Sequence, residues 1–105
     1  MVVRSCRGDG PAFFGVDGKD WRFEDCVLTD ADFRELRLVD GVIERCEFAG
    51  ADFGGARIAE VSIRDSVLER LGGAPGLAGA TVDVGTLMSM APGLATGLGI
   101  TVVSR

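Results

Sequence analysis

Large apolar residues recur at every fifth position through the middle of this chain. Starting at Phe23, ten successive positions five residues apart are each Phe, Leu or Ile. These positions are Phe23, Leu28, Phe33, Leu38, Ile43, Phe48, Phe53, Ile58, Ile63 and Leu68. A period of five fits neither an α-helix, which repeats about every 3.6 residues, nor a β-strand, which alternates about every two. Such an internal repeat predicts a solenoid, in which each repeat packs against its neighbours.

A second set of uncharged, mostly small residues lies two positions before each large one. It runs from Trp21 through Cys26 and Ala31 to Ser66. All the charged residues between positions 21 and 70 occupy the other three positions of each five. Because burying a charge is costly, we expect two side chains in five to point inward and three to point outward.

The five-residue units that begin at Ala31, Cys46 and Ala51 read ADFRE, CEFAG and ADFGG. They resemble the A(D/N)LXX signature of pentapeptide-repeat proteins, and the resemblance covers residues 21–70 without a break. It implies an all-β fold, a right-handed quadrilateral parallel β-helix in which five residues form one side and four sides form one coil. The large residue and the small residue before it would both fill the interior.

Coils built in this way imply which inward side chains stack on one another. The predicted stacks are Phe23 with Ile43 and Ile63, Leu28 with Phe48 and Leu68, Phe33 with Phe53, and Leu38 with Ile58. Cys26, Cys46 and Ser66 form a further stack. Coils about 4.8 Å apart are compatible with a disulfide between the two cysteines. In a reducing compartment, however, two buried free thiols are the favoured state.

A solenoid exposes unpaired strand edges at its two ends, so we expect both ends to be capped. Residues 1–20 are rich in Gly, and Gly18 breaks the five-residue pattern there, so they are predicted to form an N-terminal cap or an irregular opening coil. Phe13, Phe14 and Trp21 are expected to cover the first rung there. Residues 21–70 are the regular repeats of a single domain, 1–105.

The repeat slips by one residue after Leu68. It resumes at Leu77, Val82 and Leu87, directly after an interruption that contains Gly and Pro. The shifted pattern predicts a last coil over residues 71–88.

The tail, residues 89–105, is expected to contain helix followed by a strand-like segment at 100–103. Asp83 is predicted to cap a short helix and Pro92 to begin a second one. A tail of this kind resembles the C-terminal helix of many pentapeptide-repeat proteins, which implies either a cap over the last coil or a dimer contact. The candidate self-association residues, most of them at the four-residue spacing of one helical face, are Leu87, Met90, Leu94 and Leu98.

The composition argues against an enzyme. The chain has no His, which removes the commonest general base, the usual serine and cysteine triads and the commonest metal ligand. Three Cys without a CxxC motif fit neither a disulfide framework nor a zinc site, and the spacing of the acids fits no calcium-binding loop. We therefore expect no catalytic residue, no cofactor and no metal.

The chain contains no run of 18 apolar residues, and its N-terminus lacks the apolar core of a signal peptide. These features predict a cytoplasmic protein without a membrane span. Arg far outnumbers Lys, and Ala, Gly, Val and Asp are abundant, as in GC-rich bacterial genomes. The formal net charge of −5 argues against direct binding to nucleic acid.

The outward charges predict where a partner would bind. The side of Leu28, Phe48 and Leu68 and the adjacent side of Phe33 and Phe53 each carry −2, whereas the other two sides carry −1 and 0. The contact residues predicted for a basic partner are Asp30, Asp32, Glu35, Glu47, Asp52 and Glu69. The outward apolar residues, whose contacts would depend weakly on salt, are Val27, Val39, Val42 and Val67. We expect a scaffold or interaction module for a protein partner that the sequence does not identify.

The alternative is an acidic protein that imitates DNA, because some pentapeptide-repeat proteins bind DNA topoisomerases in this way. Residues 21–70 carry the whole net charge of −5, over roughly 12 Å of rod at about 4.8 Å per coil. A duplex of that length carries about seven negative charges. The charge density is comparable, but the rod is only about a third of a helical turn long. A tail-to-tail dimer would double that length.

Overall fold

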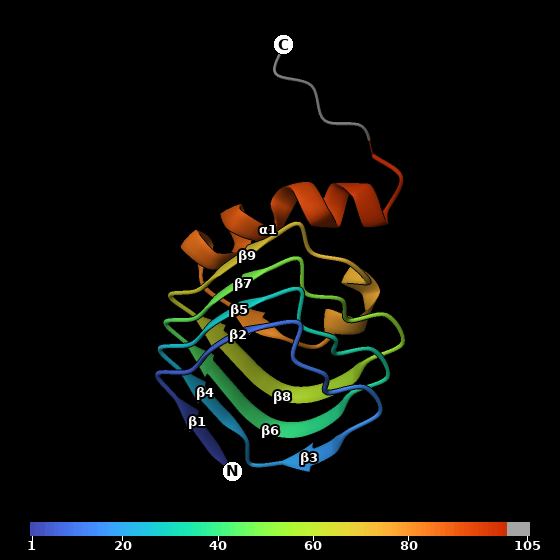
Figure 1. Cartoon of the computed structure of the whole chain (residues 1–105). Coiled ribbons are helices and arrows are strands. Elements are labelled where there is room, and N and C mark those ends of the chain that lie inside the picture. Colours follow the sequence, from blue (N-terminus) through green and yellow to red (C-terminus); the bar gives the residue numbers. More distant parts are fainter. Residues whose placement is uncertain (101–105) are drawn as a thin grey trace.

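The structure is a computed structural model that describes residues 1–100. Its strands pair in parallel with strands twenty positions away, so that Val3 lies beside Phe23 and Gly8 beside Leu28. The chain thus forms a parallel β-solenoid of about four coils, and a single helix lies across its C-terminal end (Figure 1). The fold is mostly β, as the resemblance of the five-residue units implies.

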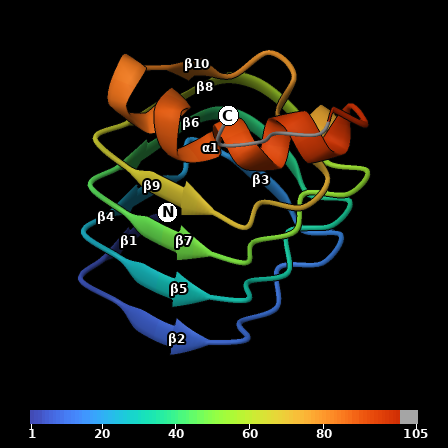
Figure 2. The same cartoon turned by 90° about the horizontal axis from the view of Figure 1, so that it is seen from above.

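Two parallel sheets run along the solenoid. One follows the order β1 (Val2–Arg4), β4 (Arg22–Glu24), β6 (Arg37–Glu44), β8 (Arg57–Arg64) and β10 (Thr81–Val82), and β3 (Asp17–Lys19) pairs with the first half of β6. The other stacks β2 (Arg7–Asp9), β5 (Val27–Thr29), β7 (Glu47–Ala49) and β9 (Val67–Glu69), which Figure 2 shows side by side. A further column is held by isolated bridges at Ala12, Asp32, Asp52 and Gly72.

The paired positions fall into four columns, and we call the outward residues of each column a face and number the faces in chain order. Face 1 is the outer surface of β1, β4 and the second halves of β6 and β8. Face 2 is the outer surface of β2, β5, β7 and β9. Face 3 belongs to the column of bridges, and face 4 to β3 and the first halves of β6 and β8.

The five-residue period is also a period of the backbone conformation, which the pattern of apolar residues does not reveal. Every fifth residue from Ser5 to Arg70 has a positive φ, between 50° and 74°. Each of these residues lies two positions after a large inward position and turns the chain onto the next face. Only Gly10, Gly15, Gly50 and Gly55 in this series are Gly, and five of the others are Asp, whose short polar side chain tolerates the left-handed region better than most.

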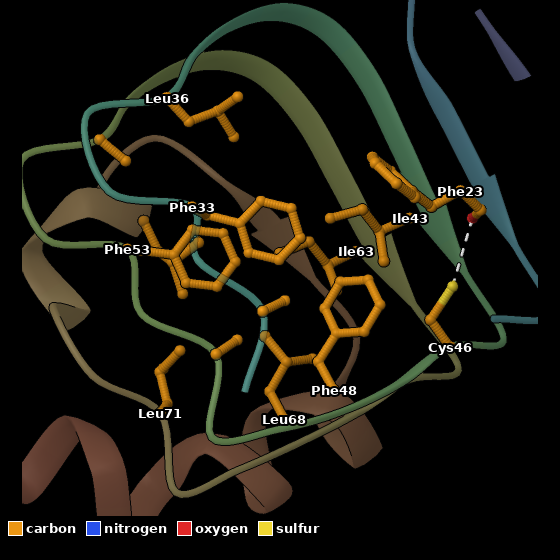
Figure 3. Close-up of a cluster of buried hydrophobic side chains, with 14 of the residues drawn as sticks. Phe23, Phe33, Leu36, Ile43, Cys46, Phe48, Phe53, Ile63, Leu68 and Leu71 are labelled. Carbon is orange, nitrogen blue, oxygen red and sulfur yellow. Dashed lines mark hydrogen bonds between the residues drawn. The ribbon is translucent and has the colours of Figure 1, made fainter. Parts of the chain in front are cut away.

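The interior is built from the predicted stacks, which the strand register confirms. The rings of Phe13, Phe33 and Phe53 lie nearly parallel, with centroids 5.1 Å and 4.9 Å apart. Phe23 and Phe48 meet this stack edge to face or tilted, as Figure 3 shows for the central coils. Aromatic packing of this kind adds stabilisation to the burial of apolar area.

The two inner cysteines are buried and carry free thiols. The Cys46 thiol donates to the carbonyl of Phe23 at 3.4 Å (Figure 3), and burial raises its pKa to about 11. A thiol with so high a pKa is a poor nucleophile at neutral pH. The structure thus holds Cys26 and Cys46 as interior residues rather than as the disulfide that their spacing allows.

The first twenty residues are more regular than the sequence indicates, because they form a coil in the same register as the next one. Trp21 explains the apparent break at Gly18, because a Cβ atom on Gly18 would clash with the Trp21 ring. The indole therefore fills the interior space that Gly18 leaves empty. Phe13 is half-buried against the core, but Phe14 is exposed and does not cover the first rung.

The C-terminal segment departs further from the predicted last coil. A short 3-10 helix, η1 (Ala74–Leu77), follows the interruption, and β10 then pairs with β8 one residue out of step, with Val82 beside Ile63. This register confirms the predicted slip. Leu77 is buried as expected, but Leu87 is exposed. The helix α1 (Val84–Gly97) has already begun at that position and turns Thr86 inward instead.

The helix α1 is continuous through Pro92, so the prediction of a second helix that begins at this residue is wrong. Asp83 is the N-cap residue, as predicted, and its carboxylate accepts hydrogen bonds from the Thr86 hydroxyl and the Asp65 amide. Met90 is buried and Leu94 packs against the last coil. The helix covers the end of the solenoid (Figure 1). The predicted strand at 100–103 lies almost entirely outside the described residues.

Candidate binding surfaces

Three of the four acids on face 1, Glu24, Asp25 and Glu44, are neutralised within the chain by a connected set of ion pairs, and Asp65 is the exception within residues 1–100. Glu24 is only 8% exposed and binds Arg4 at 2.7 Å and Arg22 at 2.8 Å. Arg45 bridges Glu44 and Asp25 at 2.8 Å and 2.7 Å, and Arg22 lies 3.6 Å from Glu44. Hydrogen bonds from these arginines hold the pKa of Glu24 and of Asp25 below their ordinary values. Face 1 therefore offers little uncompensated charge.

The acids on faces 2 and 3 are largely uncompensated. All six predicted contact residues lie on these two adjacent faces, as the period requires. Asp32 alone among them has an ion pair in residues 1–100, a two-pronged contact with Arg34 at 2.9 Å for each oxygen. The other five predicted contact residues have no basic group within salt-bridge distance in residues 1–100: Asp30, Glu35, Glu47, Asp52 and Glu69.

Face 2 also has a shallow hollow of about 390 Å³. Two rows of outward side chains line it, Val27 with Glu47 and Val67 in one row, and Thr29 with Ala49 and Glu69 in the other. Val67 is one of the exposed large apolar residues of the chain. The hollow thus combines carboxylates with aliphatic groups, which suits a Lys or Arg side chain with its aliphatic stem.

Face 4 has four charged residues in the second and third coils, Arg37, Asp40, Arg57 and Glu60. Their charges sum to zero, yet the positive and negative residues are sorted into two rows. Arg37 and Arg57 lie in register on neighbouring strands along one edge of the face, and Asp40 and Glu60 follow three residues later at the corner with face 1. Between the rows lie the exposed residues Val39 and Ala59. None of the four charged residues has an ion pair in residues 1–100.

The face 4 arrangement was missed from the sequence because only the net charge of each side was considered. A comparison of single positions twenty residues apart would have found it. The sequence has Arg at both 37 and 57, and an acid at both 40 and 60. Hydrogen bonding to Asp40 and repulsion from its carboxylate raise the pKa of Glu60.

The four candidate self-association residues do not share one accessible surface. Met90 is buried under the solenoid end and Leu94 is half-buried there, so both serve the packing of α1. Leu87 and Leu98 are exposed, at 43% and 74%. With Val84 and Met88 they form an outer face on a helix that contains no charged residue.

Residues 1–100 contain no group of three or more His, Cys, Asp or Glu residues placed to hold a metal ion. Within the same range, α1 is neither long nor apolar enough to cross a membrane. The sequence matches no protein-family model, and no curated protein is significantly similar to it.

Proposed function

We propose that this chain is a pentapeptide-repeat protein, with the right-handed quadrilateral coil of that family, and that it is a non-enzymatic module for binding another protein. The twenty-residue register, the inward stacks and the left-handed residue at every fifth position support the family. The lack of any His and the raised pKa of the buried Cys46 thiol support a role in binding rather than in catalysis.

Faces 2 and 3 form the proposed binding surface, and its ligand is a basic protein segment. The uneven compensation of charge carries this proposal. Glu24 and Asp25 on face 1 are satisfied by arginines of the same chain, whereas within residues 1–100 no arginine lies within salt-bridge distance of Glu47, Asp52 or Glu69 on faces 2 and 3. Free carboxylates beside exposed aliphatic groups provide both attraction and contact area for Lys and Arg side chains.

A titration with a defined basic probe tests this proposal. The probe is a twelve-residue peptide of alternating Arg and Val, added to the isotopically labelled full chain and followed by chemical-shift changes. We expect the largest shifts in the hollow of face 2, at Thr29, Glu47 and Ala49, and small shifts at Val39 and Ala59 on face 4. The same peptide with Gln in place of Arg is the control and should cause much smaller shifts.

Charge reversal identifies the carboxylates involved. The double substitution Glu47→Lys and Glu69→Lys should weaken binding of the Arg-Val peptide at least tenfold. The double substitution Asp20→Lys and Asp65→Lys makes the same change in net charge away from faces 2 and 3, and should weaken binding only slightly. Equal weakening in the two variants would mean that the peptide senses net charge alone, and the proposed surface would be wrong.

A partner that normally binds DNA is the second candidate. The observation that favours it is the confinement of the charge: residues 21–60 carry the whole net charge of −5, while the ends are neutral. Binding to an array of phosphate-like charges falls steeply with salt. Contact through the hollow of face 2 involves only Glu47 and Glu69 among the acids, beside Val27 and Val67, so it should depend on salt less steeply. The salt dependence measured with a captured DNA-binding partner therefore separates the two candidates.

A further inference from the structure

On face 4 the opposite charges are sorted into separate rows, and none of these residues has an ion pair in residues 1–100. Arg37 and Arg57 line hollows on this face together with Asp17 and Glu35. Neither acid lies within salt-bridge distance of either arginine. The positive row is thus free to bind carboxylates from outside the chain, and the acidic row of Asp40 and Glu60 is equally free to bind cations.

We propose that face 4 binds face 4 of a second copy of this chain, with the positive row of each copy against the acidic row of the other. A two-fold axis parallel to the solenoid axis produces this pairing. It places Arg37 opposite Asp40 of the second copy and Arg57 opposite its Glu60, and each contact occurs twice. A two-fold axis along the strands would instead place like charges together.

The arrangement of charged and aliphatic residues on face 4 supports face 4 of a second copy as its partner. Charged rows lie at the two edges and aliphatic groups lie between them, so the centre loses water while the edges form ion pairs. Val39 is 45% exposed at the centre, beside the exposed Ala59 and the half-buried Ile58. In the first coil the rows hold Asp17 and Asp20, which are like charges and would face each other in this pairing, so the ion pairs come from the second and third coils.

The size of the face predicts a weak dimer. Three coils at about 4.8 Å and four residues at about 3.3 Å give a contact of roughly 14 Å by 13 Å. A stable interface buries about 800 Å² on each partner, which is several times more. We therefore expect a dissociation constant of about 0.1–1 mM, stronger at low salt because the ion pairs are exposed.

Sedimentation equilibrium of the full chain, at low salt and up to about 1 mM, tests the proposal with two charge-reversed variants. One carries Arg37→Glu and Arg57→Glu, the other Asp40→Lys and Glu60→Lys. The corner positions accept a long basic side chain, since Arg45 and Arg70 already occupy equivalent corners with positive φ. Each variant alone should form its homodimer with an affinity at least tenfold lower than that of the unmodified chain. An equimolar mixture should associate at least tenfold more tightly than the unmodified chain.

The mixture keeps the test valid if a single variant loses stability, because heterodimer formation requires two folded chains. The matched control carries Arg64→Glu and Arg70→Glu, two exposed arginines outside face 4 that have no ion pair in residues 1–100. It should dimerise like the unmodified chain. A chain that is monomeric throughout, or a mixture that fails to associate, would overturn the proposal. So would a dimer that survives both reversals and is lost with Met88→Glu on the outer face of α1.

Discussion

The two ends of the solenoid differ in how they satisfy the backbone groups of the outermost coil. In successive coils the amide of Asp25 donates to the carbonyl of Glu44, and that of Arg45 to Arg64. At the C-terminal end the equivalent amide of Asp65 donates instead to the Asp83 carboxylate. Side chains at the beginning of α1 thus replace the carbonyls of a coil that is not present.

Two further amides of the last coil are also satisfied by side chains of the helix. The Ser66 amide donates to the Thr86 hydroxyl at 3.0 Å, and the Leu68 amide donates to the Ser89 hydroxyl at 3.1 Å. At the N-terminal end β1, β2 and β3 each pair on one side only within residues 1–100. Backbone groups at that edge depend on water, so the first coil should open at a lower free energy than the last. The side-chain oxygens of Asp83, Thr86 and Ser89 thus accept hydrogen bonds from amides of the last coil, in the place that a further coil would occupy.

The largest expected effect comes from truncating the phenylalanine stack at its two ends. Phe53 is 2% exposed beneath the capped end, and Phe53→Ala should cost about 3–5 kcal/mol in the free energy of unfolding. Phe13 belongs to the same stack but is only half-buried, so Phe13→Ala should cost about 1–2 kcal/mol. Urea denaturation of the full chain measures both values. Equal losses would mean that the two ends are equally well packed.

A smaller effect is expected from loosening the cap itself. Met90 is 4% exposed between α1 and the last coil, and Met90→Ala should cost about 2–4 kcal/mol. Leu98, at 74% exposure just after the helix, is the matched control. Its replacement by Ala should change stability by less than about 0.5 kcal/mol. If Leu98→Ala were as costly as Met90→Ala, the outer surface of the helix would itself be buried, for example against a second copy.

The inward stacks could be predicted from the sequence because a large apolar residue recurs wherever the interior must be filled. The positive φ at every fifth residue could not be predicted from residue types. Glu35, Arg45 and Arg70 adopt this left-handed conformation although their types do not favour it. The first coil was judged irregular because Gly18 lacks a large side chain. The compensation by Trp21 comes from a neighbouring position and is visible only in three dimensions.

The transition to α1 could not be located from the apolar pattern. Leu87 continues the five-residue period, but the hydrogen-bonding needs of the last coil place Thr86 inward instead. The candidate surfaces were predictable in part. The acids of faces 2 and 3 follow from counting charges on each side, whereas their lack of ion pairs depends on side-chain geometry. The sorted rows of face 4 were hidden by a net charge of zero.

The smallest expected effect is a difference in acid sensitivity between the ends. Glu24 joins the first coil to the second through Arg4, and hydrogen bonds from Arg22 hold its folded-state pKa below the ordinary value of 4.5. Asp83 joins α1 to the last coil, and the Thr86 hydroxyl lowers its pKa below 3.8. A carboxyl with a lowered pKa stabilises the fold above its unfolded-state pKa, and this stabilisation is lost as the pH falls through the folded-state value.

Amide protection factors at pH 6 and pH 3 separate the two contributions. In the unmodified chain the protection of the Ser5 amide, which donates to the Glu24 carbonyl, should fall on acidification. Glu24→Gln should lower that protection at pH 6 and reduce its further loss, while leaving the Asp65 amide unchanged. Asp83→Asn should do the reverse. Protection that falls equally at both amides in both variants would show that the ends open together, and the independence of the two ends would be wrong.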